Sequence, residues 1–150
     1  TPLGPLEATW TGTVLVGLRF APPQTALALP SLPWTEQLAA ELAAYFAHPS
    51  THSWQIPYRW SGTSFQQRVW QILTTIPVGQ TRRYGELAQV LTSGARAVGG
   101  ACRANPLPLI IPCHRVVARQ GLGGYDGAVQ GPELERKSWL LRHEGVLTHF

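Results

Sequence analysis

Residues 105–116 read NPLPLIIPCHRV, an apolar run that carries a cysteine, Cys113, into a buried setting, with Pro112 stiffening its approach. His114 follows directly. A cysteine is a strong nucleophile only as a thiolate, and a neighbouring base or cation makes that form accessible. Because adjacent side chains on a strand point to opposite faces, a direct contact between Cys113 and His114 requires a helical or turn backbone. A bridging water would also connect them.

A third group that orients the histidine would complete a relay, and Glu144 is the candidate for it. The pair by itself has two interpretations, because a buried cysteine is inert more often than it is reactive. Cys113 is therefore either a nucleophile or a residue of the core. Two cysteines with scattered histidines do not have the usual spacing of a zinc site.

Three helical patterns precede this stretch, over residues 64–76, 81–91 and 95–104. Ser64 begins a capping box at the start of the first pattern. The short turn 92–94 joins the second and third patterns, which is typical of a helix-turn-helix whose second helix lies in a DNA groove. An ordinary antiparallel helix pair has the same spacing and is the alternative.

The third helical pattern opens with ARAVGGA at residues 95–101, which are small residues around one arginine. Gly99 and Gly100 inside a helix cost ~1 kcal/mol each relative to alanine, so we expect them to permit the close approach of another backbone. That other body is either a neighbouring helix or DNA. If it is DNA, Arg96 projects from a smooth surface and can reach between bases.

The first 60 residues differ from the rest in their pattern. Residues 11–20 and 54–60 are strand-like, and residues 35–46 have helical spacing with Thr35 as a plausible N-cap. The sequence therefore predicts an α+β fold. Its parts are a small N-terminal α/β sheet domain, residues 1–60, and a mainly helical C-terminal domain with a helix-turn-helix, residues 61–150.

Composition and charge restrict the classes of protein that remain. Apolar residues make up 44% and charged residues 13% of 150 residues, which excludes a disordered chain. No apolar run approaches the ~20 residues of a membrane span. Two cysteines exclude a disulfide framework and favour a reducing, cytoplasmic setting. Residues 61–150 hold ten basic and five acidic residues, a charge of +5, which would attract a polyanion such as nucleic acid.

The motif PCHRV at residues 112–116 resembles the active-site motif of the O6-alkylguanine-DNA alkyltransferases, the direct-reversal DNA repair proteins. The resemblance continues in order and with similar spacing from Phe65 to Val146. It includes Thr81 with Tyr84, the stretch RAVGGA at residues 96–101, Asn105 with Pro106, and WLLRHEG at residues 139–145.

The resemblance implies a function and a role for each matching residue. The function is irreversible, stoichiometric transfer of the alkyl group of O6-alkylguanine, and of O4-alkylthymine, from DNA to Cys113. His114 would activate Cys113 through water, and Glu144 would orient His114. Tyr84 would help to rotate the nucleotide and donate a proton toward the departing base. Arg96 would fill the space that the flipped nucleotide leaves.

The resemblance also implies how the chain binds DNA. Asn105 would tie the recognition helix to the active-site turn, and that helix would lie in the minor groove, where small residues allow close approach. Further candidates for contact with DNA or the flipped base are Ala97, Gly99, Gly100, Arg103, Arg115, Tyr125 and Asp126. Asp126 stands where many members have serine, so its carboxylate would either weaken recognition of the O6 side or point to solvent.

The expected partner is double-stranded DNA with the alkylated base flipped out. We expect the protein to be a monomer and not to bind a membrane. We expect no cofactor. Some relatives hold a structural zinc in the N-terminal part, but here that part has no cysteine and only His48 and His52, so we expect no metal. Cys102 is expected to be a small hydrophobic residue in a helix interface.

Two other functions compete with this interpretation. Alkyltransferase-like damage-sensing proteins flip the same bases but lack the acceptor cysteine, and Cys113 argues against that class. A sequence-specific helix-turn-helix regulator would need side chains that read base edges in the major groove. The Ala- and Gly-rich helix offers few of them.

Overall fold

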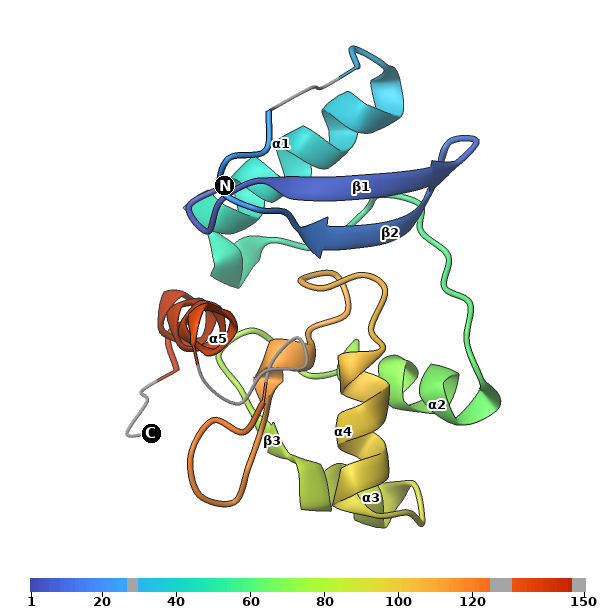
Figure 1. Cartoon of the computed structure of the whole chain (residues 1–150), viewed down its shortest axis with the longest axis vertical. Coiled ribbons are helices and arrows are strands. Elements are labelled where there is room, and N and C mark those ends of the chain that lie inside the picture. Colours follow the sequence, from blue (N-terminus) through green and yellow to red (C-terminus); the bar gives the residue numbers. More distant parts are fainter. Residues whose placement is uncertain (27–29, 125–130, 147–150) are drawn as a thin grey trace. The chain divides into compact units, whose positions relative to one another are not determined.

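The computed structural model describes residues 1–26, 30–124 and 131–146. The chain divides into two compact units, Thr1–Trp60 and Ser61–Phe150. The fold is α+β, which confirms the class predicted from the sequence (Figure 1). In the described part of the chain, no helix is both long enough and apolar enough to cross a lipid bilayer.

The first unit is built on a β-hairpin. Strands β1 (Leu6–Thr11) and β2 (Val14–Phe20) pair antiparallel. The turn between them contains Gly12 at φ 60°, a left-handed conformation that favours glycine. The prediction of one strand over residues 11–20 was therefore incomplete. The turn lies near the start of that range, β2 covers the rest of it, and the prediction did not include β1. The stretch expected at 54–60 runs parallel to β2 through a bridge between Leu15 and Tyr58.

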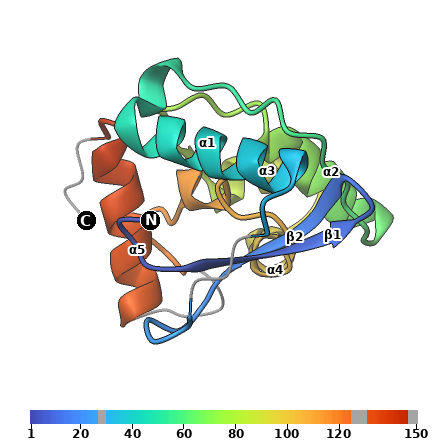
Figure 2. The same ribbon diagram turned by 90° about the horizontal axis from the view of Figure 1, so that it is seen from above.

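Helix α1 (Pro33–Ala47) follows the hairpin and lies on one side of it (Figures 1 and 2), and the 3₁₀-helix η1 (Pro49–Thr51) comes next. The prediction of Thr35 as N-cap was wrong. Leu32 is the N-cap because Pro33 occupies the first helical position, where its missing N–H costs nothing. Thr35 lies one turn further on, and its Oγ1 accepts the Leu32 N–H at 3.2 Å.

The second unit contains four α-helices and one short parallel sheet among its described residues. The helices are α2 (Ser64–Leu73), α3 (Tyr84–Val90), α4 (Ala95–Arg103) and α5 (Pro132–His143). Strands β3 (Arg82–Arg83) and β4 (Val116–Val117) pair in parallel, and β4 follows directly on the 3₁₀-helix η2 (Cys113–Arg115). Side chains from α2, α4, α5 and the apolar run before Cys113 form the core: Val69, Trp70, Leu73, Val98, Ala101, Leu107, Leu109, Ile111, Leu140 and Leu141.

Two helix starts differ from the prediction. The capping box at α2 is formed by Thr63, not Ser64: Thr63 Oγ1 accepts the Gln66 N–H at 3.1 Å, and Gln66 Oε1 accepts the Thr63 N–H at 3.0 Å. Helix α3 begins at Tyr84, not at Thr81, because the residues before it pair with β4. This pairing places the start of α3 beside the strand that leaves the Cys113 turn.

Helices α3 and α4 pack on each other and are joined by the short turn 91–94. Thr92 in this turn has φ 53°, a left-handed conformation that is uncommon for a residue with a branched side chain. Trp70 Nε1 donates to the carbonyl oxygen of Ala101 at 2.9 Å and so connects α2 to the buried face of α4. Residues on the opposite face of α4, among them Arg96, Ala97 and Gly100, are exposed.

Candidate active site

Cys113 begins η2, and it is buried together with the apolar run that leads to it. Cys113 and His114 therefore lie on a helical turn and not on a strand, where their side chains would point to opposite faces. Ahead of it, Asn105 Nδ2 donates to the carbonyl oxygen of Ile111 at 2.8 Å, and Asn105 Oδ1 accepts the Leu107 N–H at 2.9 Å. Asn105 therefore connects the end of α4 to the segment that enters the Cys113 turn.

His114 and Glu144 are brought together from positions 30 residues apart. The distance from His114 Nε2 to Glu144 Oε2 is 2.9 Å, and both side chains are fully buried. Burial alone would raise the pKa of Glu144, but His114 and the Arg115 guanidinium oppose this and bring the pKa well below its ordinary value. Glu144 is therefore ionised at neutral pH and accepts the hydrogen bond, so the hydrogen lies on His114 Nε2.

The other ring nitrogen, His114 Nδ1, is buried and has no hydrogen-bond partner among the described residues. Burial lowers the pKa of His114, and the attraction of Glu144 opposes this shift only in part. The imidazole is therefore neutral at pH 7, with a lone pair on Nδ1. A neutral ring with one nitrogen fixed by a carboxylate and the other available is the arrangement of a general base.

Arg115 does not lie where the sequence led us to expect it. We expected it to contact DNA, but it is only 7% exposed. Its Nε and Nη2 donate to Glu144 at 2.8 and 2.9 Å, and its Nη1 donates to the carbonyl oxygen of Ile76 at 2.6 Å. Because these bonds use the guanidinium inside the protein, Arg115 fixes the carboxylate that holds His114.

Tyr84 lies at the start of α3, and its hydroxyl donates to the carbonyl oxygen of Gly124 at 3.3 Å. Burial raises the pKa of this phenol well above its ordinary value, and the nearby thiol groups of Cys102 and Cys113 add to the shift. Tyr84 therefore keeps its proton and can serve as a hydrogen-bond donor. The sequence reasoning missed Lys137, whose buried ammonium group lies beside this phenol. One feature of the sequence could have drawn attention to Lys137, because it is the single lysine of the chain.

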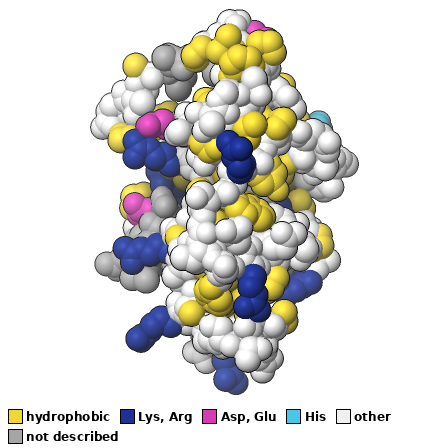
Figure 3. Space-filling view, turned by 90° about the vertical axis from the view of Figure 1, so that its right-hand side faces the viewer, with side chains coloured by type: hydrophobic (Ala, Val, Ile, Leu, Met, Phe, Trp, Pro, Cys, Tyr) yellow, Lys and Arg dark blue, Asp and Glu magenta, His cyan; other side chains and the backbone are white. Residues whose placement is uncertain are grey.

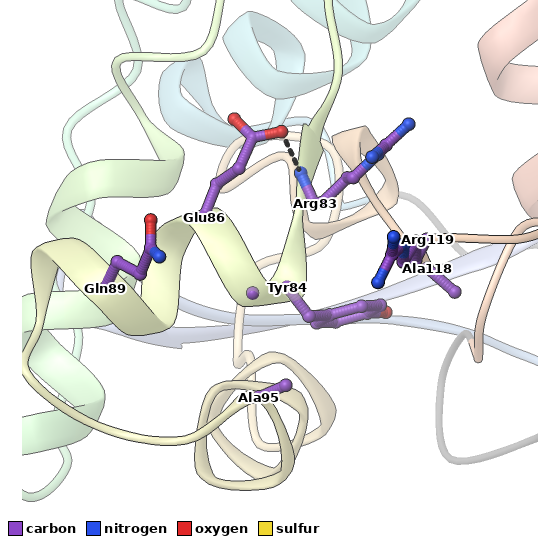
Figure 4. A pocket seen from close by; sticks show the side chains of 8 residues that line it. Arg83, Tyr84, Glu86, Gln89, Ala95, Ala118 and Arg119 are labelled. Carbon is purple, nitrogen blue, oxygen red and sulfur yellow. Dashed lines mark hydrogen bonds between the residues drawn. The ribbon is translucent and has the colours of Figure 1, made fainter.

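A pocket of about 530 Å³ opens beside Tyr84. Figure 4 shows the Tyr84 ring between Ala95 of α4 on one side and Ala118 with Arg119 on the other. Arg83 also lines the pocket. The sequence reasoning did not single out Arg83 and Arg119 as site residues, since basic residues are common on surfaces. Figure 3 shows one face of the molecule, on which Lys and Arg side chains outnumber Asp and Glu.

The outer face of α4 is exposed and smooth. Arg96, Ala97, Gly100 and Arg103 are exposed, and Gly99 is half-buried. A Cβ atom added at Gly99 or Gly100 would meet no other atom of the described chain within 4 Å. No neighbouring helix of the described chain therefore accounts for these two glycines.

Three remaining expectations concern other parts of the chain. Tyr125 and Asp126 lie outside the described residues. Cys102 is half-buried on α4, and burial raises the pKa of its thiol well above the ordinary value, which does not favour a reactive thiolate. Among the described residues, no group of three or more His, Cys, Asp or Glu side chains is arranged to hold a metal ion.

The sequence of the chain is similar to one family of known proteins. Residues 64–146 match the family model described as 6-O-methylguanine DNA methyltransferase, DNA binding domain. A curated relative, the methylated-DNA--protein-cysteine methyltransferase of Mycobacterium leprae, is 42% identical over 151 residues, which cover 96% of this chain and 88% of that protein. The protein of the same name from Shigella flexneri is 47% identical over 113 residues. That match covers 73% of this chain and 63% of the relative's length.

Solved structures have the same fold. The crystal structure of Mycobacterium tuberculosis OGT in complex with DNA matches with a TM-score of 0.78 and 39% identity, covering 96% of this chain and 88% of that one. An O6-methylguanine DNA methyltransferase from Methanococcus jannaschii matches with a TM-score of 0.69 and 31% identity, covering 97% and 91%.

Proposed function

The chain belongs to the 6-O-methylguanine DNA methyltransferase family, and from this membership we propose that it repairs DNA by transferring the alkyl group of O6-alkylguanine to Cys113. One observation carries the proposal. The buried Cys113 precedes a neutral histidine whose Nε2 is held by an ionised carboxylate and whose Nδ1 has no partner among the described residues. An inert core cysteine would not require this arrangement.

The chemistry follows from these groups. His114 Nδ1 takes the thiol proton, through a water molecule or directly, and the positive charge that forms on the ring is stabilised by Glu144. The thiolate attacks the alkyl carbon in line with the C–O6 bond. The new S–C bond forms as the C–O6 bond breaks. The electron pair of the C–O6 bond stays on O6 of the guanine. The guanine takes a proton and departs, and the thioether stays on Cys113.

Tyr84 fits the role of donor to the departing base. Because burial raises its pKa, the phenol is protonated when the leaving group gains negative charge. A donor placed where charge develops stabilises the transition state more than the ground state. Tyr84 comes from α3 and Cys113 from η2, and the β3–β4 pairing holds these two elements together.

The proposed partner is double-stranded DNA with the alkylated nucleotide turned out of the stack, which costs a few kcal/mol. We propose that the smooth face of α4 lies in the minor groove, because Gly99 and Gly100 leave room there for another backbone. Arg96 on this face would fill the vacated space. Arg83 and Arg119, which line the pocket beside Tyr84, would bind phosphates of the same strand.

We also propose a cytoplasmic location. The reaction needs Cys113 in its thiol form, and the structure contains no disulfide between Cys102 and Cys113. A reducing compartment maintains this state.

O4-alkylthymine is part of the proposed substrate range, because its alkyl carbon is attached to oxygen in the same way.

The test is loss of O6-methylguanine from a duplex oligonucleotide, with the Cys113→Ser variant as the control. We expect the wild-type protein to convert the lesion to guanine and the variant to leave it unchanged. A damage-sensing protein without transfer activity would bind the lesion duplex but leave it methylated. That outcome in the wild-type protein would refute the proposal.

A further inference from the structure

The single lysine of this chain is a buried residue with several bonds that the proposed reaction does not explain. Lys137 lies on α5 and its side chain is 0% exposed. Its Nζ donates to the carbonyl oxygens of Leu122 and Gly124, the latter at 2.9 Å, and it lies 3.4 Å from the hydroxyl oxygen of Tyr84. Lysine is almost never fully buried without partners, so these contacts must offset a large cost of desolvation.

The number of partners matches the chemistry of an ammonium group. A protonated lysine has three N–H donors and no acceptor. The three oxygen atoms of Leu122, Gly124 and Tyr84 are all acceptors within reach of it. A neutral amine has two N–H donors, so it would leave one of these oxygen atoms without its bond.

The two carbonyl groups lie on either side of Gly123, and Gly123 packs directly on Tyr84. Gly123 has φ 75°, and a Cβ atom built there would lie 2.8 Å from Tyr84 Cε2 and 3.3 Å from the Ala118 nitrogen. The segment Leu122–Gly124 is thus held by the close packing of Gly123 on the Tyr84 ring and by the bonds of the ammonium group to the carbonyl oxygens of Leu122 and Gly124. Lys137 Nζ itself lies 5.5 Å from the centre of the ring.

From this geometry we infer that Lys137 is a positioning residue that fastens the segment Leu122–Gly124 to α5 and thereby fixes the Tyr84 phenol beside the acceptor cysteine. The inference rests on the proposed function, since alkyl transfer is one of its readouts. The lysine exchanges no proton with the substrate in this role. It acts through the backbone of the segment and through the orientation of Tyr84.

The role has a pH dependence that a plain packing role would not have. Burial lowers the pKa of Lys137 to about 8, and Cys113 and Cys102 oppose this shift. His114 also interacts electrostatically with the ammonium group, and Tyr84 contacts it directly. The group therefore loses its third donor as the pH rises through about 8. Above that pH, the advantage of lysine over an uncharged side chain of similar length should disappear.

The experiment compares alkyl transfer by the wild-type protein and Lys137→Met at pH values from neutral to well above 8. Methionine keeps the length of the side chain and removes all three donors. A misplacement of about 1 Å can cost ~10²-fold in rate, so we expect Lys137→Met to be about 10- to 100-fold slower at pH 7. The ratio of the two rates should fall toward one above pH 8. Equal rates at pH 7, or a ratio that does not change with pH, would overturn the inference.

Arg142→Met is the matched control, because it removes one exposed positive charge from the same helix. It should react at the wild-type rate. If Lys137→Met fails to fold, Gly123→Ala loosens the same segment at its contact with Tyr84 and should also slow transfer. Where both variants fold, their effects should be less than additive in the double variant, since both act on the position of one segment. Full additivity would contradict the inference.

A readout independent of activity separates this inference from the proposed function. Protein labelled with ¹⁵N-lysine gives one side-chain resonance, which should titrate near pH 8 and exchange its hydrogens slowly below that pH. The peptide containing residues 118–124 should exchange its backbone amides faster in Lys137→Met than in the wild-type protein. A wild-type protein that passes these two tests but transfers no alkyl group refutes the proposed function alone. Unchanged amide exchange in the variant refutes the inference.

Discussion

Glu144→Gln is the substitution whose effect can be worked out most fully from the structure. Glutamine keeps the size of the side chain and removes the charge from a carboxylate that is 0% exposed. That carboxylate accepts hydrogen bonds from His114 Nε2 at 2.9 Å and from Arg115 Nε and Nη2 at 2.8 and 2.9 Å. The variant leaves the guanidinium buried without its counter-charge.

The expected loss of stability is large. Removing one partner of a buried ion pair costs about 3–5 kcal/mol, because the remaining charge is desolvated without compensation. In a protein of about 150 residues, each kcal/mol lowers Tm by roughly 2–4 °C. The Tm of Glu144→Gln should therefore fall by about 6–20 °C at neutral pH.

The loss of stability in Glu144→Gln should depend on pH. The pKa of Glu144 is lower in the folded state than in the unfolded state, where a glutamate titrates near 4.3. The stability that the carboxylate contributes is fully present above the unfolded pKa and is lost as the pH falls toward the lower, folded pKa. The difference in Tm between the wild-type protein and the variant should therefore be constant above about pH 5 and shrink below about pH 4.

Thermal unfolding between pH 3 and pH 8 measures this difference. Glu135→Gln is the control, because it makes the same chemical change at an exposed position of α5. Alkyl transfer by Glu144→Gln should also fall, by up to the ~10²–10⁴-fold that general base catalysis contributes. The affinity for DNA should stay close to wild type, since Glu144 is buried. Equal melting temperatures for Glu144→Gln and Glu135→Gln would refute the reasoning.

Two further predictions concern the interface with DNA. Arg96→Ala should slow repair of duplex DNA far more than reaction with free O6-benzylguanine, because only the duplex requires extrusion of the nucleotide; equal losses in the two rate assays would show another role for Arg96. Gly100→Ala should raise the free energy of unfolding by up to ~1 kcal/mol, because its Cβ meets open space, and yet weaken binding to duplex DNA. Denaturant unfolding and a binding titration measure the two effects, and unchanged affinity would show that α4 does not closely approach DNA.

The candidate site was partly predictable because its chemistry is local in the sequence. Cys113 and His114 are adjacent, and the need for a turn backbone between them follows from the geometry of strands and helices. Glu144 could be suggested only as a third group, and its 2.9 Å contact with His114 depends on how α5 packs. For Gly99 and Gly100 the sequence left two alternatives, a neighbouring helix or a DNA backbone, and the structure shows no neighbouring helix of the described chain there. That absence depends on the packing of the whole unit, which the local pattern does not contain.

Other features could not be predicted, because they depend on long-range partners. Arginine is usually exposed, but Arg115 is buried because Glu144 and the Ile76 carbonyl oxygen accept hydrogen bonds from its guanidinium group. Lys137 is buried for the same kind of reason, through the carbonyl groups of the segment Leu122–Gly124. Helix starts were missed by one to three residues where a proline or a strand pairing outweighed the local pattern, as at α1 and α3.

The most direct test of the proposed function is the mass of the protein after incubation with an excess of duplex DNA containing O6-methylguanine. We predict that each molecule gains one methyl group and then stops, because the S–C bond of the thioether is stable. Peptide mapping should place the methyl group on Cys113. Methyl transfer to Cys102 instead, repeated turnover with no change in protein mass, or no transfer at all would contradict the proposed reaction.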